Sequence, residues 1–121
     1  MAKNLEISLL LDFYGDMLTD KQRDMVDYYY NDDLSLSEIA ENEGITRQGV
    51  RDSIKRAEAQ MLEMEERLGL ARRFRKINAD IEEIYQLAQT IRQYSEFPGC
   101  PREVTDSAAR IMMLAGMLEK D

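Results

Sequence analysis

Side chains suited to nucleic-acid recognition are concentrated in residues 34–57, which read LSLSEIAENEGITRQGVRDSIKRA. From position 46 onward, Arg, Gln and Lys recur at short intervals among apolar residues. Guanidinium and amide groups read base edges in a major groove, and flanking cations bind phosphates. These residue types therefore favour a helix that contacts duplex nucleic acid.

Helical periodicity separates the polar side chains of this stretch from the apolar ones. At about 100° per residue, Val50, Ile54 and Ala57 share one side and are expected to face the protein. The predicted binding set is Thr46, Arg47, Gln48, Arg51, Asp52, Lys55 and Arg56. We expect Gln48, Arg51 and Asp52 to point at base edges and Arg47, Lys55 and Arg56 to meet phosphates, while Thr46 caps the helix.

The residues before this helix predict a second helix and a tight turn. Ser35 and Glu38 have the spacing of a capping box, so a short helix begins after Ser35. Ala40 is small enough for a close helix crossing, and Gly44 accepts positive φ without steric cost. The pattern is that of a helix-turn-helix. The alternative is a helical packing unit that contacts no nucleic acid.

A second basic run, ARRFRK, occupies residues 71–76. Its cations are Arg72, Arg73, Arg75 and Lys76. They could contact the phosphates of DNA or of a structured RNA, where shape and backbone contacts dominate. They could equally form a basic rim on an oligomer interface.

Catalysis and metal binding are not expected. The chain has no histidine, so the commonest general base and the commonest metal ligand are missing. Glu63, Glu65 and Glu66 lack suitable partners and are interpreted as a solvated helix face. The single cysteine, Cys100, suits a reducing cytoplasm. We therefore expect a cytoplasmic protein that is not an enzyme, uses no cofactor or metal, and does not insert into a membrane.

Charge is distributed unevenly along the chain. The net charge is −8, yet residues 46–76 carry nine Lys and Arg against five Asp and Glu. Because fields act locally over about 8 Å at physiological salt, this basic band matters more than the total. The acidic remainder leaves open a different role, in which the body docks on a basic protein.

Apolar spacing predicts helices throughout and no strand, so the fold class is all-α. The first helix is expected to use Leu5, Leu9, Phe13 and Met17 as its apolar side, with Leu10 and Tyr14 beside them. Thr19 and Gln22 form a capping box, which starts a second helix at Asp20. The SEFPGCP segment interrupts the helices, and the last one is expected from Pro101 to about Lys120.

A long apolar seam follows the turn. Its members step by four and three residues: Val50, Ile54, Ala57, Met61, Met64, Leu68, then Leu70, Phe74, Ile77, Ile81, Ile84, Ala88 and Ile91. Such a narrow stripe is typical of paired helices, with Gly69 bending or splitting it. We expect residues 1–68 to form the helix-turn-helix domain and 69–121 a helical extension for oligomerisation. A dimer is favoured, with methionines such as Met61 and Met112 at the interface.

Several motifs resemble known bacterial sequences. The matching residues are Leu18, Thr19, Gln22 and Arg23; Ser35, Glu38, Ile39 and Ala40; and Gly44, Ile45, Thr46, Arg47, Val50 and Arg51. They resemble the promoter-reading region 4 of bacterial housekeeping sigma factors. The segments LLLDFYG, YYYNDDLSLSEIAE and ITRQGVRDSIKR are more specifically similar to the YlxM family of small bacterial proteins.

The resemblance implies a sigma region 4-like helix-turn-helix bundle with a long helical arm and an extra C-terminal helix. It also implies a DNA-binding regulatory protein that acts with the signal recognition particle pathway. Components of that particle are then expected partners, beside DNA or structured RNA. The alternative is a non-enzymatic interaction module that docks on a component of the particle, with the helix-turn-helix as scaffold.

Overall fold

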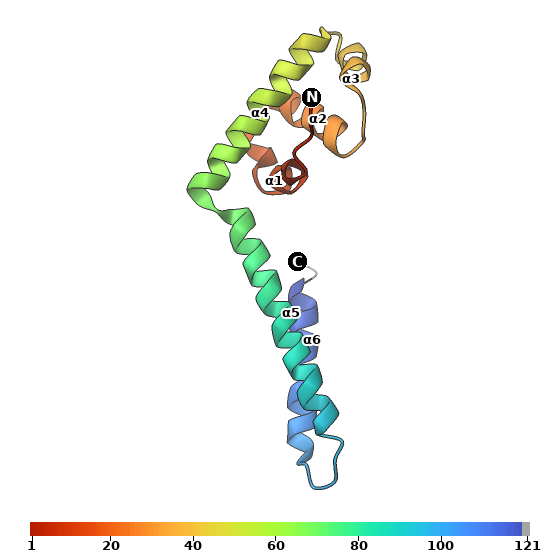
Figure 1. Ribbon diagram of the computed structural model, residues 1–121, viewed down its shortest axis with the longest axis vertical. Coiled ribbons are helices and arrows are strands. Elements are labelled where there is room, and N and C mark those ends of the chain that lie inside the picture. The colour runs from red at the N-terminus through yellow and green to blue at the C-terminus, as the bar shows by residue number, and fades with distance from the viewer. Residues whose placement is uncertain (120–121) are drawn as a thin grey trace. The chain divides into compact units, whose positions relative to one another are not determined.

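The computed structural model describes residues 1–119, and all regular structure in that range is helical (Figure 1). The elements are α1 (Glu6–Tyr14), the 3₁₀ turn η1 (Gly15–Met17), α2 (Asp20–Tyr30), α3 (Leu36–Glu43), α4 (Arg47–Leu68), α5 (Leu70–Tyr94) and α6 (Arg102–Glu119). The predicted all-α fold is confirmed. The chain divides into two compact units, Met1–Arg72 and Arg73–Asp121, with the boundary near the start of α5.

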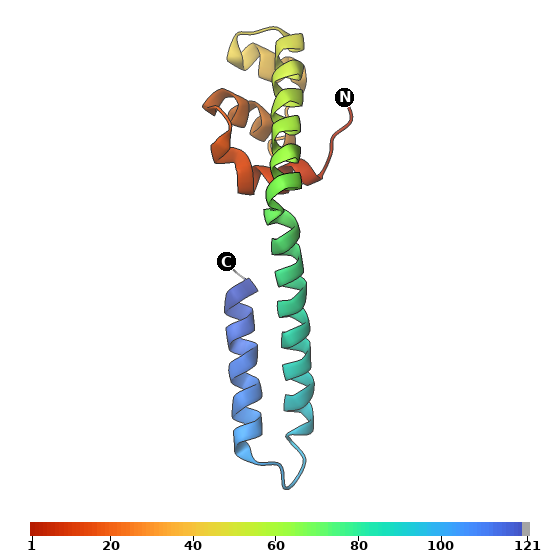
Figure 2. The same ribbon diagram turned by 90° about the vertical axis from the view of Figure 1, so that its left-hand side faces the viewer.

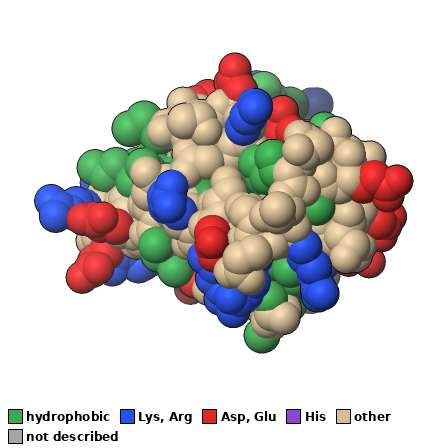
Figure 3. Space-filling model, turned by 90° about the horizontal axis from the view of Figure 1, so that it is seen from above, with side chains coloured by type: hydrophobic (Ala, Val, Ile, Leu, Met, Phe, Trp, Pro, Cys, Tyr) green, Lys and Arg blue, Asp and Glu red, His purple; other side chains and the backbone are tan. Residues whose placement is uncertain are grey.

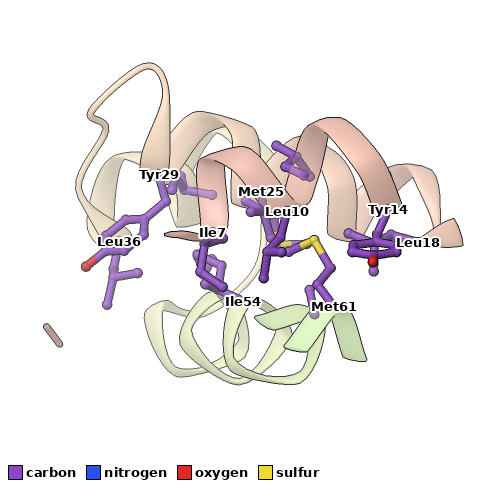
Figure 4. Packing of buried hydrophobic residues seen from close by; sticks show 14 of the residues in the cluster. Ile7, Leu10, Tyr14, Leu18, Met25, Tyr29, Leu36, Ile54 and Met61 are labelled. Atoms are coloured by element: carbon purple, nitrogen blue, oxygen red, sulfur yellow. The ribbon is translucent and has the colours of Figure 1, made fainter. Parts of the chain in front are cut away.

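The first unit is built around α4, which contacts α1, α2 and α3. Its core draws apolar side chains from all four helices, and Figure 4 shows them meeting between the α1–α2 layer and α4. The most deeply buried large side chains are Tyr14, Ile7, Leu10, Ile39, Ile54, Met61, Val26 and Val50. Three helices, α1, α2 and α3, therefore hold α4 by one side only, along its first four turns.

Two capping boxes fix where α2 and α3 begin. The amide of Gln22 donates to Thr19 Oγ1 over 3.2 Å, and the Thr19 amide donates back to Gln22 Oε1 over 3.1 Å. Ser35 and Glu38 repeat this exchange at the start of α3: the Glu38 amide donates to Ser35 Oγ over 3.1 Å, and the Ser35 amide donates to Glu38 Oε1 over 3.2 Å. Each box satisfies two N–H groups that a helix end leaves without partners. Both predicted starts are confirmed.

The predicted apolar side of α1 is wrong at its two ends and misses Ile7. Leu5 is 84% exposed and Met17 is 66% exposed, whereas the predicted Leu10 and Tyr14 are buried, as is Ile7. The helix ends at Tyr14 and continues into η1, so the four-residue spacing from Leu5 to Met17 never forms one face. The two outer residues lie beyond the ends of the regular helix.

Gly69 ends α4 in the left-handed conformation, with φ of 64°, and so splits the seam as predicted. Glu65, one turn earlier, then caps the start of α5. Its Oε1 accepts the Ala71 amide over 3.0 Å, and its Oε2 accepts the Arg72 amide over 3.1 Å. Tyr14 donates its hydroxyl hydrogen to Glu65 Oε1 over 2.8 Å and accepts the Leu70 amide over 3.2 Å. The expectation that Glu65 belongs to a solvated face is therefore wrong.

The second unit contains most of α5 and all of α6, which run antiparallel and lie side by side (Figures 1 and 2). The turn between them holds Pro98, Gly99 and the half-buried Cys100. Thr105 donates its hydroxyl hydrogen to Ser95 Oγ over 2.9 Å and ties the two helices together near the turn. α6 begins at Arg102, one residue later than predicted, and the predicted end at Lys120 lies outside the described residues.

Met61 does not belong to an oligomer interface. Its side chain is fully buried in the core of the first unit, beside Leu10 (Figure 4). Met112, in contrast, lies half-buried on α6 of the second unit. Among the described residues, no helix combines the length and apolar character needed to cross a membrane.

Candidate nucleic-acid interface

The turn between α3 and α4 has the geometry that its sequence predicts. Gly44 adopts φ of 67° and ψ of 30°, and its amide donates to the Ala40 carbonyl. The Ile45 amide donates to the same carbonyl over 3.1 Å. A left-handed residue at this point reverses the chain within two residues, because glycine carries no Cβ that would clash. α3 and α4 therefore contact each other directly after the turn.

Thr46 caps α4 and orients its first turn. The backbone of Thr46 is extended, and its Oγ1 accepts the Gly49 amide over 3.0 Å. The amides of Arg47 and Gln48 remain at the helix N-terminus, where the helix dipole favours an anion. The predicted role of Thr46 as a cap is confirmed, and its site leaves backbone donors available to a phosphate.

Anchoring by the core decides which side of α4 faces outward. Val50, Ile54 and Ala57 have no exposed surface, as the periodicity predicted. All seven members of the predicted binding set, by contrast, are exposed: Thr46, Arg47, Gln48, Arg51, Asp52, Lys55 and Arg56. The structure thus places the whole set on the surface of the first two and a half turns of one rigid helix.

Part of this face borders a shallow depression of about 430 Å³. Arg47, Gln48 and Arg51 line it together with Met1 and Leu36. Sequence reasoning missed the last two residues. Leu36 opens α3 directly after the cap residue Ser35, a signal that could have placed it near the start of that helix, whereas no sequence pattern connects Met1 with α4.

Two residues of the set bind each other. Gln48 Nε2 donates to Asp52 Oδ1 over 2.9 Å, a contact of i to i+4 spacing. Both side chains were predicted to read bases. A base edge that engaged Gln48 would have to replace this hydrogen bond, and the Asp52 carboxylate would stand close to the approaching phosphates.

The cations of the α4 face are not neutralised by the protein itself. Among residues 1–119, no ion pair engages Arg47, Arg51, Lys55 or Arg56. Figure 3 looks down onto the α3–α4 turn and shows Lys and Arg side chains interspersed with Asp and Glu side chains, most of the acidic ones toward the rim of the view. Unpaired cations of this kind are available to bind a polyanion.

The second basic run is divided between the two units. Arg72 belongs to the first unit, and its Nε lies 4.0 Å from Glu65 Oε2. Arg73, Arg75 and Lys76 belong to the second unit, where Lys76 Nζ lies 3.4 Å from Asp80 Oδ1. All four side chains are exposed. Compared with the α4 face, this run carries more of its charge next to carboxylates.

The geometry agrees with comparisons against known families. The sequence pattern of the family described as "Putative helix-turn-helix protein, YlxM / p13 like", UPF0122, matches residues 1–97. The chain belongs to the UPF0122 family. The matched range contains the whole α3–α4 turn and the complete outward face of α4, so the UPF0122 description as a helix-turn-helix protein applies to this site.

Relatives of UPF0122 type extend the match over most of the chain. A UPF0122 protein of Thermoanaerobacter sp. (strain X514) is 41% identical over 107 residues, which cover 88% of this chain and 92% of the relative. A UPF0122 protein of Acetivibrio thermocellus is 54% identical over 74 residues, covering 61% of this chain and 63% of the relative. One from Desulforamulus reducens is 44% identical over 82 residues, covering 68% and 70%.

Proposed function

We propose that this UPF0122 protein binds duplex DNA through the outward face of α4 and acts as a non-enzymatic regulator. The observation that carries the proposal is the placement of Arg47, Gln48, Arg51 and Lys55. They are exposed on a helix whose opposite side is fixed by a buried core. A major groove is about 12 Å wide and admits one α-helix, whereas the deep groove of A-form RNA does not.

The roles within the face follow from position along α4. Gln48, Arg51 and Asp52 are proposed to meet base edges, because they occupy the middle of the exposed arc. Arg47 and Arg56 lie toward its flanks and are proposed to bind phosphates. Lys55 lies on the middle of the arc, one turn beyond Arg51, and is also proposed to bind a phosphate. Thr46 supports the arrangement by capping the helix, and the basic run at Arg72, Arg73, Arg75 and Lys76 is proposed as a weaker, sequence-independent contact.

Salt-dependent binding tests this proposal. Fluorescence anisotropy with a duplex DNA probe should show that log affinity falls linearly with log salt concentration, with a slope of about −0.9 per neutralised phosphate. Lys55→Ala should reduce the magnitude of that slope by about one phosphate. Arg51→Ala should cost about 1–3 kcal/mol on a specific site and relax selectivity at one base pair.

Lys21→Ala is the matched control, because it removes one exposed cation from α2. The neighbouring Gln22 donates to Gln60 Oε1 over 3.2 Å, so this part of α2 lies beside a later turn of α4. Equal losses for Lys21→Ala, Arg51→Ala and Lys55→Ala would show that only total charge matters. Stronger binding to a structured RNA hairpin, lost with the same two substitutions, would move the proposal from DNA to RNA.

The family resemblance adds a cellular setting to the proposal: the cytoplasm and the signal recognition particle pathway. A pull-down from lysate, with and without nuclease, tests it. Capture of particle components that disappears with nuclease would support nucleic acid as the link. Binding to the purified particle GTPase that survives Arg51→Ala and Lys55→Ala would support the interaction module instead.

We further propose a division of labour, with residues 1–68 binding nucleic acid and residues 69–121 joining two copies. The support is that the core of the first unit ends close to the α4–α5 turn, whereas the helices that follow keep large apolar side chains at the surface.

A further inference from the structure

The second unit buries very few large side chains of its own. Within its described part, residues 73–119, the buried positions are Ile81, Ala88, Ser95, Ala108 and Ala115. Only one of these is a large aliphatic residue. Two helices with an alanine-rich contact cannot shield their apolar stripes, and helical hairpins become stable when another pair of helices covers them.

The uncovered apolar surface of α5 lies on one flank of its contact with α6. We take Ile81 and Ala88 as the contact line and count about 100° per residue. Ile77, Ile84 and Ile91 then fall about 40–80° to one side. They are 49%, 48% and 46% exposed, and they recur every seven residues.

The uncovered surface of α6 repeats this pattern. Measured from Ala108 in the same sense of rotation, Ile111 and Leu118 fall about 60–80° away. They are 40% and 58% exposed, again seven residues apart. Leu114, 43% exposed, extends the same flank, as Leu87 does on α5 with 57%.

Both flanks lie on the same face of the hairpin. Because α5 and α6 run in opposite directions, an equal rotation in the same sense from the contact line points to the same side. The groove between the helices confirms this geometry. Ile91 of α5 and Val104 and Ile111 of α6 line one depression of about 310 Å³, together with Ala108.

The size of this apolar face matches what a protein interface needs. Seven aliphatic side chains, each 40–58% exposed, contribute to it: Ile77, Ile84, Leu87, Ile91, Ile111, Leu114 and Leu118. They leave on the order of 600 Å² of apolar surface, the upper end of what monomeric proteins expose in one patch. A stable interface buries about 800 Å² on each partner, rim included.

We propose that this face docks on the same face of a second copy of the chain, so that two hairpins form a four-helix bundle. A two-fold pair requires a self-complementary surface. Here both ridges carry large aliphatic residues at the same seven-residue interval, so either ridge of one copy fits the spacing of either ridge of the other. The proposal rests on the association of two copies stated above and specifies the surface that performs it.

The charges at the edge of the face are compatible with such a pair. Asp80 lies close to the apolar flank of α5, and Lys76 Nζ donates to its Oδ1 over 3.4 Å. Glu82 and Gln89 lie on the other side of α5, away from the apolar flank, and both are exposed. α5 is therefore apolar on one side of its contact with α6 and polar on the other.

Sedimentation of the full chain without nucleic acid tests the proposal. Between about 1 and 100 μM, the mass should approach twice 14.1 kDa, as expected for an affinity in the micromolar range or tighter. Ile84→Ala with Ile111→Ala should weaken association at least ~10-fold, because both ridges lose their central contact. Alanine preserves helix propensity, so circular dichroism should show unchanged helix content.

Gln89→Ala is the matched control on the polar face of α5 and should associate like the wild type. A wild-type chain that keeps the mass of one copy at the highest concentration would overturn the proposal, even if another protein covered the face. Undiminished association of the Ile84→Ala, Ile111→Ala double variant would overturn the proposal as well. Since nucleic acid is absent, neither result depends on whether α4 binds DNA.

Discussion

At the scale of single residues, Asp52 is the group on the α4 face that opposes binding to a polyanion. It sits among the exposed cations of the second turn and holds Gln48 through a 2.9 Å hydrogen bond. In the proposed complex, an aspartate at this position would lower nonspecific affinity for any phosphate backbone and would leave selectivity to the sites that can release Gln48.

Asp52→Asn should therefore tighten binding to a random duplex by about two- to tenfold, the effect of one exposed charge near phosphates. Discrimination between a specific site and random DNA should fall. Competition anisotropy with both duplexes measures the two affinities. Asp24→Asn, which neutralises an exposed carboxylate on α2, serves as control, and an equal gain from that variant would contradict the local role of Asp52.

Glu65 is a second residue whose surroundings matter, because they change the pKa of its carboxyl group. Its side chain is only 16% exposed. Burial, the largest influence, raises the pKa of Glu65, but the hydrogen bonds from Tyr14 and from the amides of Ala71 and Arg72 bring the pKa below its ordinary value of 4.5. Burial and the hydrogen bond to Glu65 raise the pKa of Tyr14, which stays protonated as the donor. The carboxylate form is thus favoured by folding.

The stability contributed by Glu65 should be present above pH 4.5 and lost as the pH falls through the lower folded-state pKa. Glu65→Gln should reduce the free energy of unfolding by about 1–3 kcal/mol at neutral pH, and the gap from the wild type should close in acid. Urea unfolding at a series of pH values measures this. The same profile for Glu66→Gln, a change at an exposed neighbour, would argue against a specific role.

At the scale of elements, the site depends on how helices begin. Three of the first four helices start at a side-chain cap, and the caps follow their sequence signatures: Thr19, Ser35 and Thr46. The caps fix the first turns of α2, α3 and α4 without help from distant contacts. Of these three helices, only α4 lacks a full capping box. Gly49 donates its amide to Thr46 but has no side chain that could accept the Thr46 amide in return.

Thr46→Ala should lower the free energy of unfolding by about 0.5–2 kcal/mol, and Thr46→Ser should restore it, because serine caps at least as well. Thermal unfolding followed by circular dichroism gives the comparison. DNA affinity should fall with Thr46→Ala as the first turn frays and recover with Thr46→Ser. A serine variant as unstable as the alanine variant would show that the threonine methyl, rather than the cap, is what matters.

Local signals also explain which sequence predictions succeed. Capping boxes and left-handed glycines act within a few residues, so the helix starts and the breaks at Gly44 and Gly69 could be predicted. The inward side of α4 followed from its regular period. Errors occurred where a distant partner decides the outcome, as at Glu65, which meets Tyr14 from α1. The prediction of Met61 at an oligomer interface failed for the same reason, since its burial depends on α1 and α2 packing over α4.

At the scale of the whole molecule, the two units differ in how they are stabilised. The first has a continuous core supplied by four helices, while the second leaves most of its large aliphatic side chains exposed. Stability of a hairpin that depends on a second copy is linked to protein concentration by mass action. The two units should therefore respond differently to dilution.

Hydrogen exchange should show this difference. Amides of α4 near Ile54 and Met61 should exchange slowly at every concentration. Those of α5 and α6 beyond residue 73 should exchange faster on dilution and become protected as concentration rises. Mass spectrometry of peptic fragments resolves the two regions. Protection of the hairpin that stays constant over a hundredfold dilution would mean that it needs no partner.

The turn between α5 and α6 contains the chain's single cysteine, half-buried Cys100. A nitroxide spin label on its Sγ would allow the distance between the turns of two associated copies to be measured. If the two hairpins of the pair are parallel, their turns lie at the same end and the two labels are close together. If the hairpins are antiparallel, the turns lie at opposite ends, and the 18 residues of α6 separate the labels by about 27 Å at 1.5 Å per residue. One electron–electron distance would then fix the direction of the symmetry axis, with no engineered attachment site.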